Sequence, residues 1–190
     1  MKFIETNFQG LFIIEIEPHA DTRGCFARVW CQDEFRRHGL ETRVVQCNLA
    51  YNHRRGTLRG MHFQAPPHEE IKIVRCVRGA VYDVAVDLRP SSRTYLQWLA
   101  VELTADNRRC LYLPAGFAHG YQTIVDEAEI FYQVSEAYHP QAERGVRWDD
   151  PIFSIHWPTV GHRIISEKDL AWPDFEPQPP AGRTPVGGKS

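Results

Sequence analysis

The chain lacks the features that mark membrane, secreted and nucleic-acid-binding proteins. Its longest purely apolar run is four residues, 11–14, whereas a helix needs about 20 apolar residues to cross a bilayer. No apolar core follows the first five residues, so we expect no secretory signal. The formal net charge is −2, which leaves no cationic surplus to neutralise a row of phosphates. These absences predict a cytoplasmic protein that binds neither membranes nor nucleic acid.

Cysteine is scarce and unpatterned. The five cysteines are an odd number and no two of them form a C-x-x-C pair; they are Cys25, Cys31, Cys47, Cys76 and Cys110. A disulfide framework or a zinc knuckle is therefore not expected, and free thiols in a reducing compartment fit better.

A glycine-rich phosphate loop and a strand–helix–strand rhythm are also absent, which disfavours a dinucleotide-binding fold. Short strand patterns dominate instead, separated by turn residues; they cover residues 11–17, 72–78, 81–88, 98–103, 111–113, 121–125 and 130–134. Within residues 81–88, Val84 and Val86 fall on one face, and Asp83 and Asp87 fall on the other. Many short strands at regular spacing predict an all-β antiparallel sandwich or barrel.

Helices and flexible segments are few. Residues 32–38 predict one short helix that ends at Gly39. From Pro173 onward proline and glycine alternate without a packable apolar face. We therefore predict a domain over residues 1–172 and a flexible C-terminal tail over residues 173–190.

Two polar segments, residues 59–72 and 114–121, are flanked by strand patterns and could share one cavity. The later segment carries a Pro-x-Gly-x-x-His pattern that ends at His119, as in metal-binding cupins. The earlier segment offers His62-x-Gln64, so the paired histidine of such a site is missing. His68 with Glu69 or Glu70 could substitute, but their spacing does not fit one strand face. Losing one of three or four ligands would leave a weak site, and we predict no metal.

Acid–base chemistry without a metal is the alternative. His62 lies between Arg59 and Lys72, and histidine titrates close to neutral pH, as a general base requires. Structural interpretations stay open for each residue. His62 could be a satisfied structural histidine, Lys72 could be solvated, His119 could belong to a turn, and Tyr132 could be a core aromatic with its hydroxyl at the rim.

Several separated motifs, in this order, resemble the dTDP-4-dehydrorhamnose 3,5-epimerase family. They are residues 57–64, 72–75, 79–89, 113–120, 155–158 and 166–169. The resemblance extends from about residue 11 to residue 173. It implies a cupin-like jelly roll, a homodimer, and activity without a metal or other cofactor. The implied substrate is a nucleotide-diphosphate-linked 4-keto-6-deoxy sugar, epimerised at C3, C5 or both through an enolate.

The resemblance also implies a role for each matching residue. His62 would be the general base, Asp169 its carboxylate partner, and Tyr132 the acid that returns a proton from the opposite face. Lys72 would bond the C4 oxygen as it becomes an enolate. The implied substrate-binding residues are Arg23 and Arg59 at the diphosphate, Gln46 and Asn48 near them, and His119, oriented by Asp83, and Tyr138 at the sugar.

This chain departs from the family pattern at three places. Arg28 stands where the family usually has an acidic residue that reads the thymine edge, Cys47 replaces a common aspartate, and residues 66–71 replace the usual loop before Lys72. Arginine only donates hydrogen bonds, so it cannot accept one from the thymine N3–H. If Arg28 faces the base, a cytidine or guanosine diphosphate sugar is predicted to bind better than a dTDP sugar.

Two rival functions belong to other classes. One is a metal-dependent cupin oxygenase, and the other is a non-catalytic sugar-binding cupin. The complete set His62, Asp169, Tyr132 and Lys72 argues against the binder, because a binding protein has no need of a base.

Overall fold

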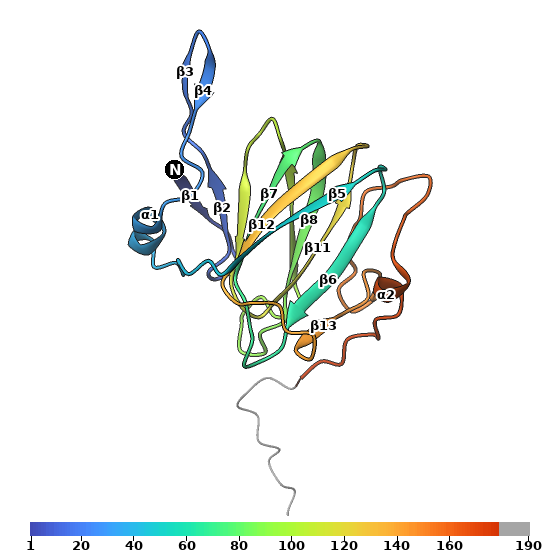
Figure 1. The fold of residues 1–190 in the computed structure, drawn as a ribbon. Coiled ribbons are helices and arrows are strands. Elements are labelled where there is room, and N and C mark those ends of the chain that lie inside the picture. The colour runs from blue at the N-terminus through green and yellow to red at the C-terminus, as the bar shows by residue number, and fades with distance from the viewer. Residues whose placement is uncertain (179–190) are drawn as a thin grey trace, which may run out of the picture.

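Antiparallel strands form nearly all of the regular structure in the computed structural model, which describes residues 1–178. The six-stranded sheet has the order β1 (Lys2–Glu5), β2 (Phe12–Glu15), β10 (Cys110–Leu113), β7 (Lys72–Arg78), β12 (Ala128–Val134) and β5 (Gln46–Asn52). The five-stranded sheet has the order β13 (Glu143–Gly145), β6 (Leu58–Gln64), β11 (Phe117–Thr123), β8 (Ala80–Asp87) and β9 (Trp98–Thr104). The described helices are short: α1 (Gln32–Arg37) and α2 (Glu167–Leu170) (Figure 1).

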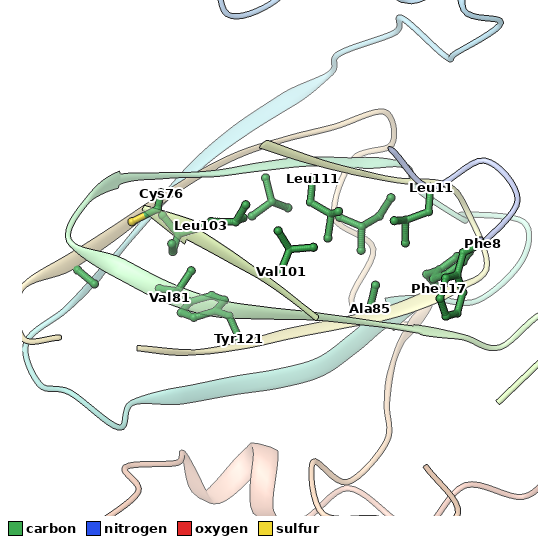
Figure 2. Close-up of a cluster of buried hydrophobic side chains, with 14 residues drawn as sticks. Phe8, Leu11, Cys76, Val81, Ala85, Val101, Leu103, Leu111, Phe117 and Tyr121 are labelled. Carbon is green, nitrogen blue, oxygen red and sulfur yellow. The ribbon is translucent and has the colours of Figure 1, made fainter. Parts of the chain in front are cut away.

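The core lies between the two sheets. Val74 and Leu111 of the six-stranded sheet and Val81 and Leu103 of the five-stranded sheet belong to one buried cluster. Figure 2 shows Val81, Leu103 and Leu111 among the side chains that fill the space between the two layers of strands. Two antiparallel sheets around a shared apolar core form the jelly-roll architecture, which confirms the all-β prediction.

The alternating strand β8 shows how the sequence builds these layers. Val81 and Ala85, which share a face with Asp83 and Asp87, pack in the core between the sheets. Val84 and Val86 point the other way, into a second buried cluster that includes Phe153. Because β8 is covered on both faces, nearly all of its residues are buried. The polar residues on its inner face therefore need partners inside the molecule.

The strand predictions were right for the apolar runs and wrong for the polar ones. Residues 72–78 form β7 with the predicted bounds. The polar residues 58–64 and 117–119, however, were not predicted as strands, and they belong to β6 and β11. Their polar side chains line an internal cavity, so the alternation of apolar and polar residues that signals a half-buried strand is missing.

Helix α1 ends as predicted. Gly39 follows the helix with a φ of +69°, a left-handed conformation that glycine adopts without strain. Phe35 on the inner side of the helix is fully buried and packs against Tyr112, with ring centroids 6.1 Å apart. This contact attaches the helix to the six-stranded sheet.

A hairpin of β3 (His19–Asp21) and β4 (Gly24–Phe26) projects from the body of the molecule (Figure 1). Its residues are exposed, and Phe26 keeps 77% of its surface accessible.

The predicted tail is described only to residue 178. Asp174 forms an ion pair with Arg147 at 3.0 Å, and the Phe175 amide donates to Asp150 at 2.6 Å. These contacts attach the start of the predicted tail to the domain. Residues 179–190, which make up the rest of it, lie outside the described residues.

All five cysteines are free thiols. Burial raises the pKa of the Cys76 and Cys110 thiols to about 11 in each case, so both are inert at neutral pH. No helix in residues 1–178 is long and apolar enough to cross a membrane.

Asp87 offers a test of how the buried polar groups stabilise the fold. Its fully buried carboxylate accepts hydrogen bonds from Arg89, Ser92 and Thr94 at 2.6–3.0 Å. Burial alone would raise the pKa of Asp87, but these hydrogen bonds outweigh it and lower the pKa below 3.8. We expect Asp87→Asn to lower the free energy of unfolding by about 1–3 kcal/mol at neutral pH.

A carboxyl group whose pKa is lowered by folding stabilises the protein above its unfolded pKa and loses that contribution as pH falls through its folded pKa. The difference between wild type and Asp87→Asn should therefore shrink below a pH of about 4. Urea unfolding of both proteins at several pH values measures it, with the exposed Asp106→Asn as control. A difference that stays constant down to the lowest pH would show that the carboxylate charge at Asp87 is not the source of the stability.

Candidate active site

A cavity of about 310 Å³ opens between the two sheets. Its lining includes six of the residues selected from the sequence: Arg59, His62, Lys72, His119, Tyr132 and Asp169. They come from both sheets and from α2, so the fold brings together side chains that are up to 110 positions apart in the sequence.

His62 and Asp169 are in direct contact. The His62 Nε2 lies 2.6 Å from the Asp169 Oδ1. Burial would raise the pKa of Asp169, but its hydrogen bonds and the neighbouring imidazole outweigh it and lower the pKa. Asp169 therefore accepts a hydrogen bond from Nε2–H. In the neutral ring this leaves Nδ1 as the nitrogen that can accept a proton. Nδ1 has no hydrogen-bond partner in residues 1–178.

Local sequence fixes the position of Asp169. The Ser166 hydroxyl caps α2 by accepting a hydrogen bond from the Asp169 amide at 3.1 Å. The second carboxylate oxygen accepts a hydrogen bond from the Gly60 amide at 3.3 Å. Gly60 has a φ of +137°, and a Cβ there would lie 2.6 Å from the Cα of Gly120 on β11. Only glycine fits this approach, which places the amide against the carboxylate.

A second histidine–aspartate pair lies beside the first. His119 on β11 is opposite His62 on β6, and its Nε2 lies 3.0 Å from each carboxylate oxygen of Asp83. Asp83 is fully buried, and His119 is 8% exposed. This is the contact that the resemblance implies, and it holds the ring of His119 in one orientation at the cavity wall.

Lys72 and Tyr132 come from the facing sheet. The Lys72 Nζ lies 3.1 Å from the Glu70 Oε1 and donates to the His62 carbonyl oxygen at 3.4 Å. Tyr132 is on β12, next to β7 in the six-stranded sheet. Burial and the Glu70 carboxylate raise the pKa of Tyr132, while Arg59 opposes them. The phenol is therefore protonated at neutral pH and can donate a proton.

Arg59 is fixed by a buried amide. Its Nε donates to the Asn52 Oδ1 at 2.9 Å, and the Tyr121 hydroxyl donates to the same oxygen at 3.3 Å. Burial raises the pKa of Tyr121 to about 12. Asn52 and Tyr121 were not selected from the sequence, because both look like ordinary core positions on strands.

A neighbouring cavity of about 320 Å³ shares His62, Lys72 and Tyr132 with the first. Gln46, Asn48 and Tyr138, which the resemblance places near the substrate, line this second cavity. The Gln46 side chain donates to that of Asn48 at 2.9 Å. The two cavities together offer one continuous set of polar groups to a ligand larger than a single sugar.

Glu143 closes one wall of the second cavity. It accepts hydrogen bonds from the Tyr138 hydroxyl at 2.7 Å and from the Lys168 Nζ at 2.6 Å. Neither Glu143 nor Lys168 was selected, because no local pattern connects a strand residue with a helix residue 25 positions later.

Arg23 and Arg28 do not line either cavity. Arg23 is on the β3–β4 hairpin and pairs with Asp21. Arg28 follows the hairpin, pairs with Glu34 at 2.7 Å, and has a side chain that is 62% exposed. The roles expected of these two arginines therefore stay predictions.

One group outside the two cavities has metal-ligand chemistry. Among the described residues, ligand atoms of His68, Glu136 and His139 lie within 4.8 Å of one another. The two imidazole rings stack with centroids 3.6 Å apart at 24°, a contact that histidine rings also make without a metal. Glu136 is also paired with Arg43 at 2.7 Å. This arrangement gives no support for a metal centre.

Comparison with known proteins agrees with the site. The sequence model of the family described as dTDP-4-dehydrorhamnose 3,5-epimerase matches residues 5–177. A dTDP-4-dehydrorhamnose 3,5-epimerase of Methanothermobacter thermautotrophicus is 44% identical over 94% of this chain and 96% of its own. The solved structure of the Bacillus anthracis enzyme with TDP and pyrophosphate bound is 40% identical with a TM-score of 0.88, covering 92% of this chain and 99% of that one.

A third similar protein differs in activity. It is a 3'-monoepimerase from Streptomyces bikiniensis, solved in complex with dTDP-quinovose, and it is 33% identical with a TM-score of 0.84. The match covers 90% of this chain and 86% of that one. The family therefore contains enzymes that differ in the number of carbons they invert.

The fold and the site define a cupin-like isomerase that acts on nucleotide sugars. This chain belongs to the dTDP-4-dehydrorhamnose 3,5-epimerase family. The relatives support an epimerase over the oxygenase and the sugar-binding protein that the sequence left as rivals.

Proposed function

We propose that the chain inverts C3 and C5 of a dTDP-linked 4-keto-6-deoxy sugar. The observation that carries the proposal is the opposition of His62 and Tyr132 across one cavity, with Lys72 beside them. His62 is supported by Asp169 and belongs to one sheet, whereas Tyr132 and Lys72 belong to the other. Inversion of a carbon needs a base and an acid on opposite faces, and this site offers such a pair.

The proposed reaction has two proton transfers at each carbon. The His62 Nδ1 takes the proton from the carbon beside the C4 ketone, and the electrons of that C–H bond form an enolate. The Lys72 ammonium donates a hydrogen bond to the enolate oxygen and stabilises its negative charge. Without this stabilisation the C–H beside the ketone would be too weak an acid to lose its proton. The Tyr132 hydroxyl then gives its proton to the opposite face of the carbon and restores the ketone. Exchange with water reprotonates the phenolate and deprotonates the imidazolium.

The remaining roles concern binding. We assign Arg59 to the diphosphate because it is a fixed cation at the cavity wall. Gln46, Asn48 and Tyr138 would contact the substrate in the second cavity, and His119 would contact the sugar in the first. No metal or other cofactor is needed for these steps.

The direct test is deuterium incorporation. The purified protein is incubated in deuterated water with 4-keto-6-deoxy sugars linked to dTDP, CDP, GDP and UDP, and the products are analysed by NMR. Deuterium at C3 and C5 of the dTDP sugar supports the proposal, and deuterium at one carbon would make the enzyme a monoepimerase. Absence of exchange with all four substrates would contradict an epimerase. Metal analysis of the same sample tests the oxygenase, which requires a stoichiometric metal.

The projecting hairpin supports a homodimer. Arg23 matches a substrate-binding position of the resembling family and Arg28 stands at its base-reading position, yet neither lines the two cavities that contain His62. The exposed Phe26 lies on the same hairpin. We propose that this hairpin packs against a second copy and brings Arg23 near that copy's cavity. Light scattering should give the mass of a dimer for the wild type, and Phe26→Asp should shift it toward the monomer; a monomeric wild type would overturn the proposal.

The free and exposed thiols support a location in the cytosol. Cys25 and Cys47 are exposed and unpaired in the structure, and such thiols persist in reducing compartments.

The sequence and the relatives lead to different predictions for the base of the nucleotide. The sequence favoured cytosine or guanine because Arg28 cannot accept a hydrogen bond from thymine. In the structure the Arg28 guanidinium donates a hydrogen bond to Glu34 at 2.7 Å. Because Glu34 already pairs with this guanidinium and the relatives are named for dTDP sugars, we expect dTDP to bind at least tenfold more tightly than CDP or GDP.

Calorimetric titration of the wild type and Arg28→Gln with the three diphosphates measures this preference. The substitution should leave the ranking unchanged. Tighter binding of CDP or GDP by the wild type, lost in Arg28→Gln, would instead make Arg28 the residue that reads the base.

A further inference from the structure

Glu70 is a largely buried acid beside the proposed catalytic groups. Its side chain is 12% exposed, like that of Lys72, with which it forms an ion pair at 3.1 Å. Its other oxygen accepts a hydrogen bond from Gln64 at 3.3 Å. Glu70 lines the cavity that contains His62, Lys72 and Tyr132. The reaction proposed above does not use it.

The hydrogen bonds of Gln64 show that the position of Glu70 is defined by the fold. Gln64 is 5% exposed, and its Nε2 lies 3.1 Å from the carbonyl oxygens of His68 and Ala137. The two hydrogens of this amide are shared among these two oxygens and the Glu70 carboxylate. Its Oε1 accepts from the His139 amide at 2.7 Å. Gln64 thus binds two loops to β6 and contacts the Glu70 oxygen that is not paired with Lys72.

The Lys72 ammonium consequently has two fixed acceptors, the Glu70 carboxylate and the His62 carbonyl oxygen at 3.4 Å. An ammonium group has three donors, so one remains for a ligand in the cavity. A long lysine side chain has many rotamers, and two acceptors on neighbouring elements select one of them. A donor that is already oriented stabilises a developing oxyanion better than a mobile one.

We propose that Glu70 is a positioning residue that directs the Lys72 ammonium at the C4 oxygen of the substrate. The proposal rests on the epimerase function proposed above. It predicts that the carboxylate charge, rather than the volume of the side chain, is what the reaction requires.

The negative charge of Glu70 also affects the pKa of Tyr132. The Glu70 carboxylate and burial raise the pKa of Tyr132, whereas Arg59 lowers it. The titratable and charged groups that line the cavities with Tyr132 are Arg59, His62, Glu70, Lys72, His119, Tyr121, Tyr138, Glu143, Lys168 and Asp169. If only the negative charge at position 70 is removed and the other groups are kept, the pKa of Tyr132 is expected to fall, so that the phenolate forms at lower pH.

The test compares two neighbouring glutamates. Glu70→Gln keeps the size and the acceptor oxygen but removes the charge, and Glu69→Gln makes the same change at an exposed position of the same loop. We expect Glu70→Gln to lower kcat about tenfold with KM within twofold of wild type, and to move the alkaline limb of the kcat profile to lower pH. Glu70→Asp, which keeps the charge, should retain the alkaline limb of the wild type. Glu69→Gln should match the wild type in every respect.

Three results would overturn the inference. Glu70→Gln could match Glu69→Gln in kcat and in pH profile, which would leave Glu70 without a part in the reaction. The activity of Glu70→Gln could fall only in step with its melting temperature, with the alkaline limb unmoved, which would assign Glu70 to the fold alone. A wild type that exchanges no deuterium would instead contradict the proposed function itself, and the inference with it.

Discussion

Replacing His62 with asparagine is expected to abolish deuterium exchange at every carbon of the sugar. Asparagine is close to histidine in shape and can still bond to Asp169, but it cannot take a proton. Because one base serves each abstraction, exchange and inversion should fall together, by about 10²- to 10⁴-fold. NMR of the substrate in deuterated water measures both. His162→Asn, on an exposed loop, is the matched control.

Asp169→Asn is expected to act through the same ring. The carboxylate accepts a hydrogen bond from the His62 Nε2 at an N···O distance of 2.6 Å and would stabilise the imidazolium that forms when Nδ1 takes a proton. An amide keeps the contact but loses the charge, so exchange should again fall by orders of magnitude.

Substantial exchange in His62→Asn would show that another residue is the base, and His119 with its own aspartate would be the first to test.

The sequence predicted the fold where strands are apolar. β7 and β8 follow the alternation of their apolar residues within about one residue. β6 and β11 were missed in whole or in part because their inner faces carry His62 and His119 instead of aliphatic residues. A strand that lines a polar cavity has the composition of a loop, so periodicity alone cannot identify it.

The site was predictable only through separated motifs. No spacing rule connects His62 with Asp169, because their contact depends on α2 packing against β6. The motifs at residues 57–64 and 166–169, taken together, identified His62 and Asp169. Glu70 had a local signal, since it is two positions from Lys72 and an extended chain would place both on one face. That spacing alone does not distinguish a buried ion pair from two solvated side chains.

The positions of Arg23 and Arg28 could not be deduced from one chain. Motif matching assigns a residue to a ligand without saying which copy of the chain supplies it. The structure shows that both arginines lie on or next to a hairpin that leaves the body (Figure 1). Their assignment to a substrate therefore requires either a second copy or a large movement of the hairpin, and the dimer measurement distinguishes these.

Tyr132→Phe is expected to separate the two proton transfers that His62→Asn removes together. The base, its aspartate and Lys72 are all retained, so His62 should still take a proton from the carbon beside the ketone. Phenylalanine has no proton to return from the opposite face. The imidazolium, after exchange with water, should return deuterium to the face from which the proton left. The mutant should therefore incorporate deuterium while inversion falls by about 10²-fold or more.

The measurement follows deuterium content and configuration at C3 and C5 in the same sample. Tyr95→Phe, whose hydroxyl bonds to Gln178 away from the two cavities, controls for loss of a phenol in general. Equal loss of exchange and inversion in Tyr132→Phe would mean that the phenol is needed before the C–H bond breaks. The hydroxyl would then serve to bind the substrate or stabilise the enolate, and the acid that completes inversion would be another group or water.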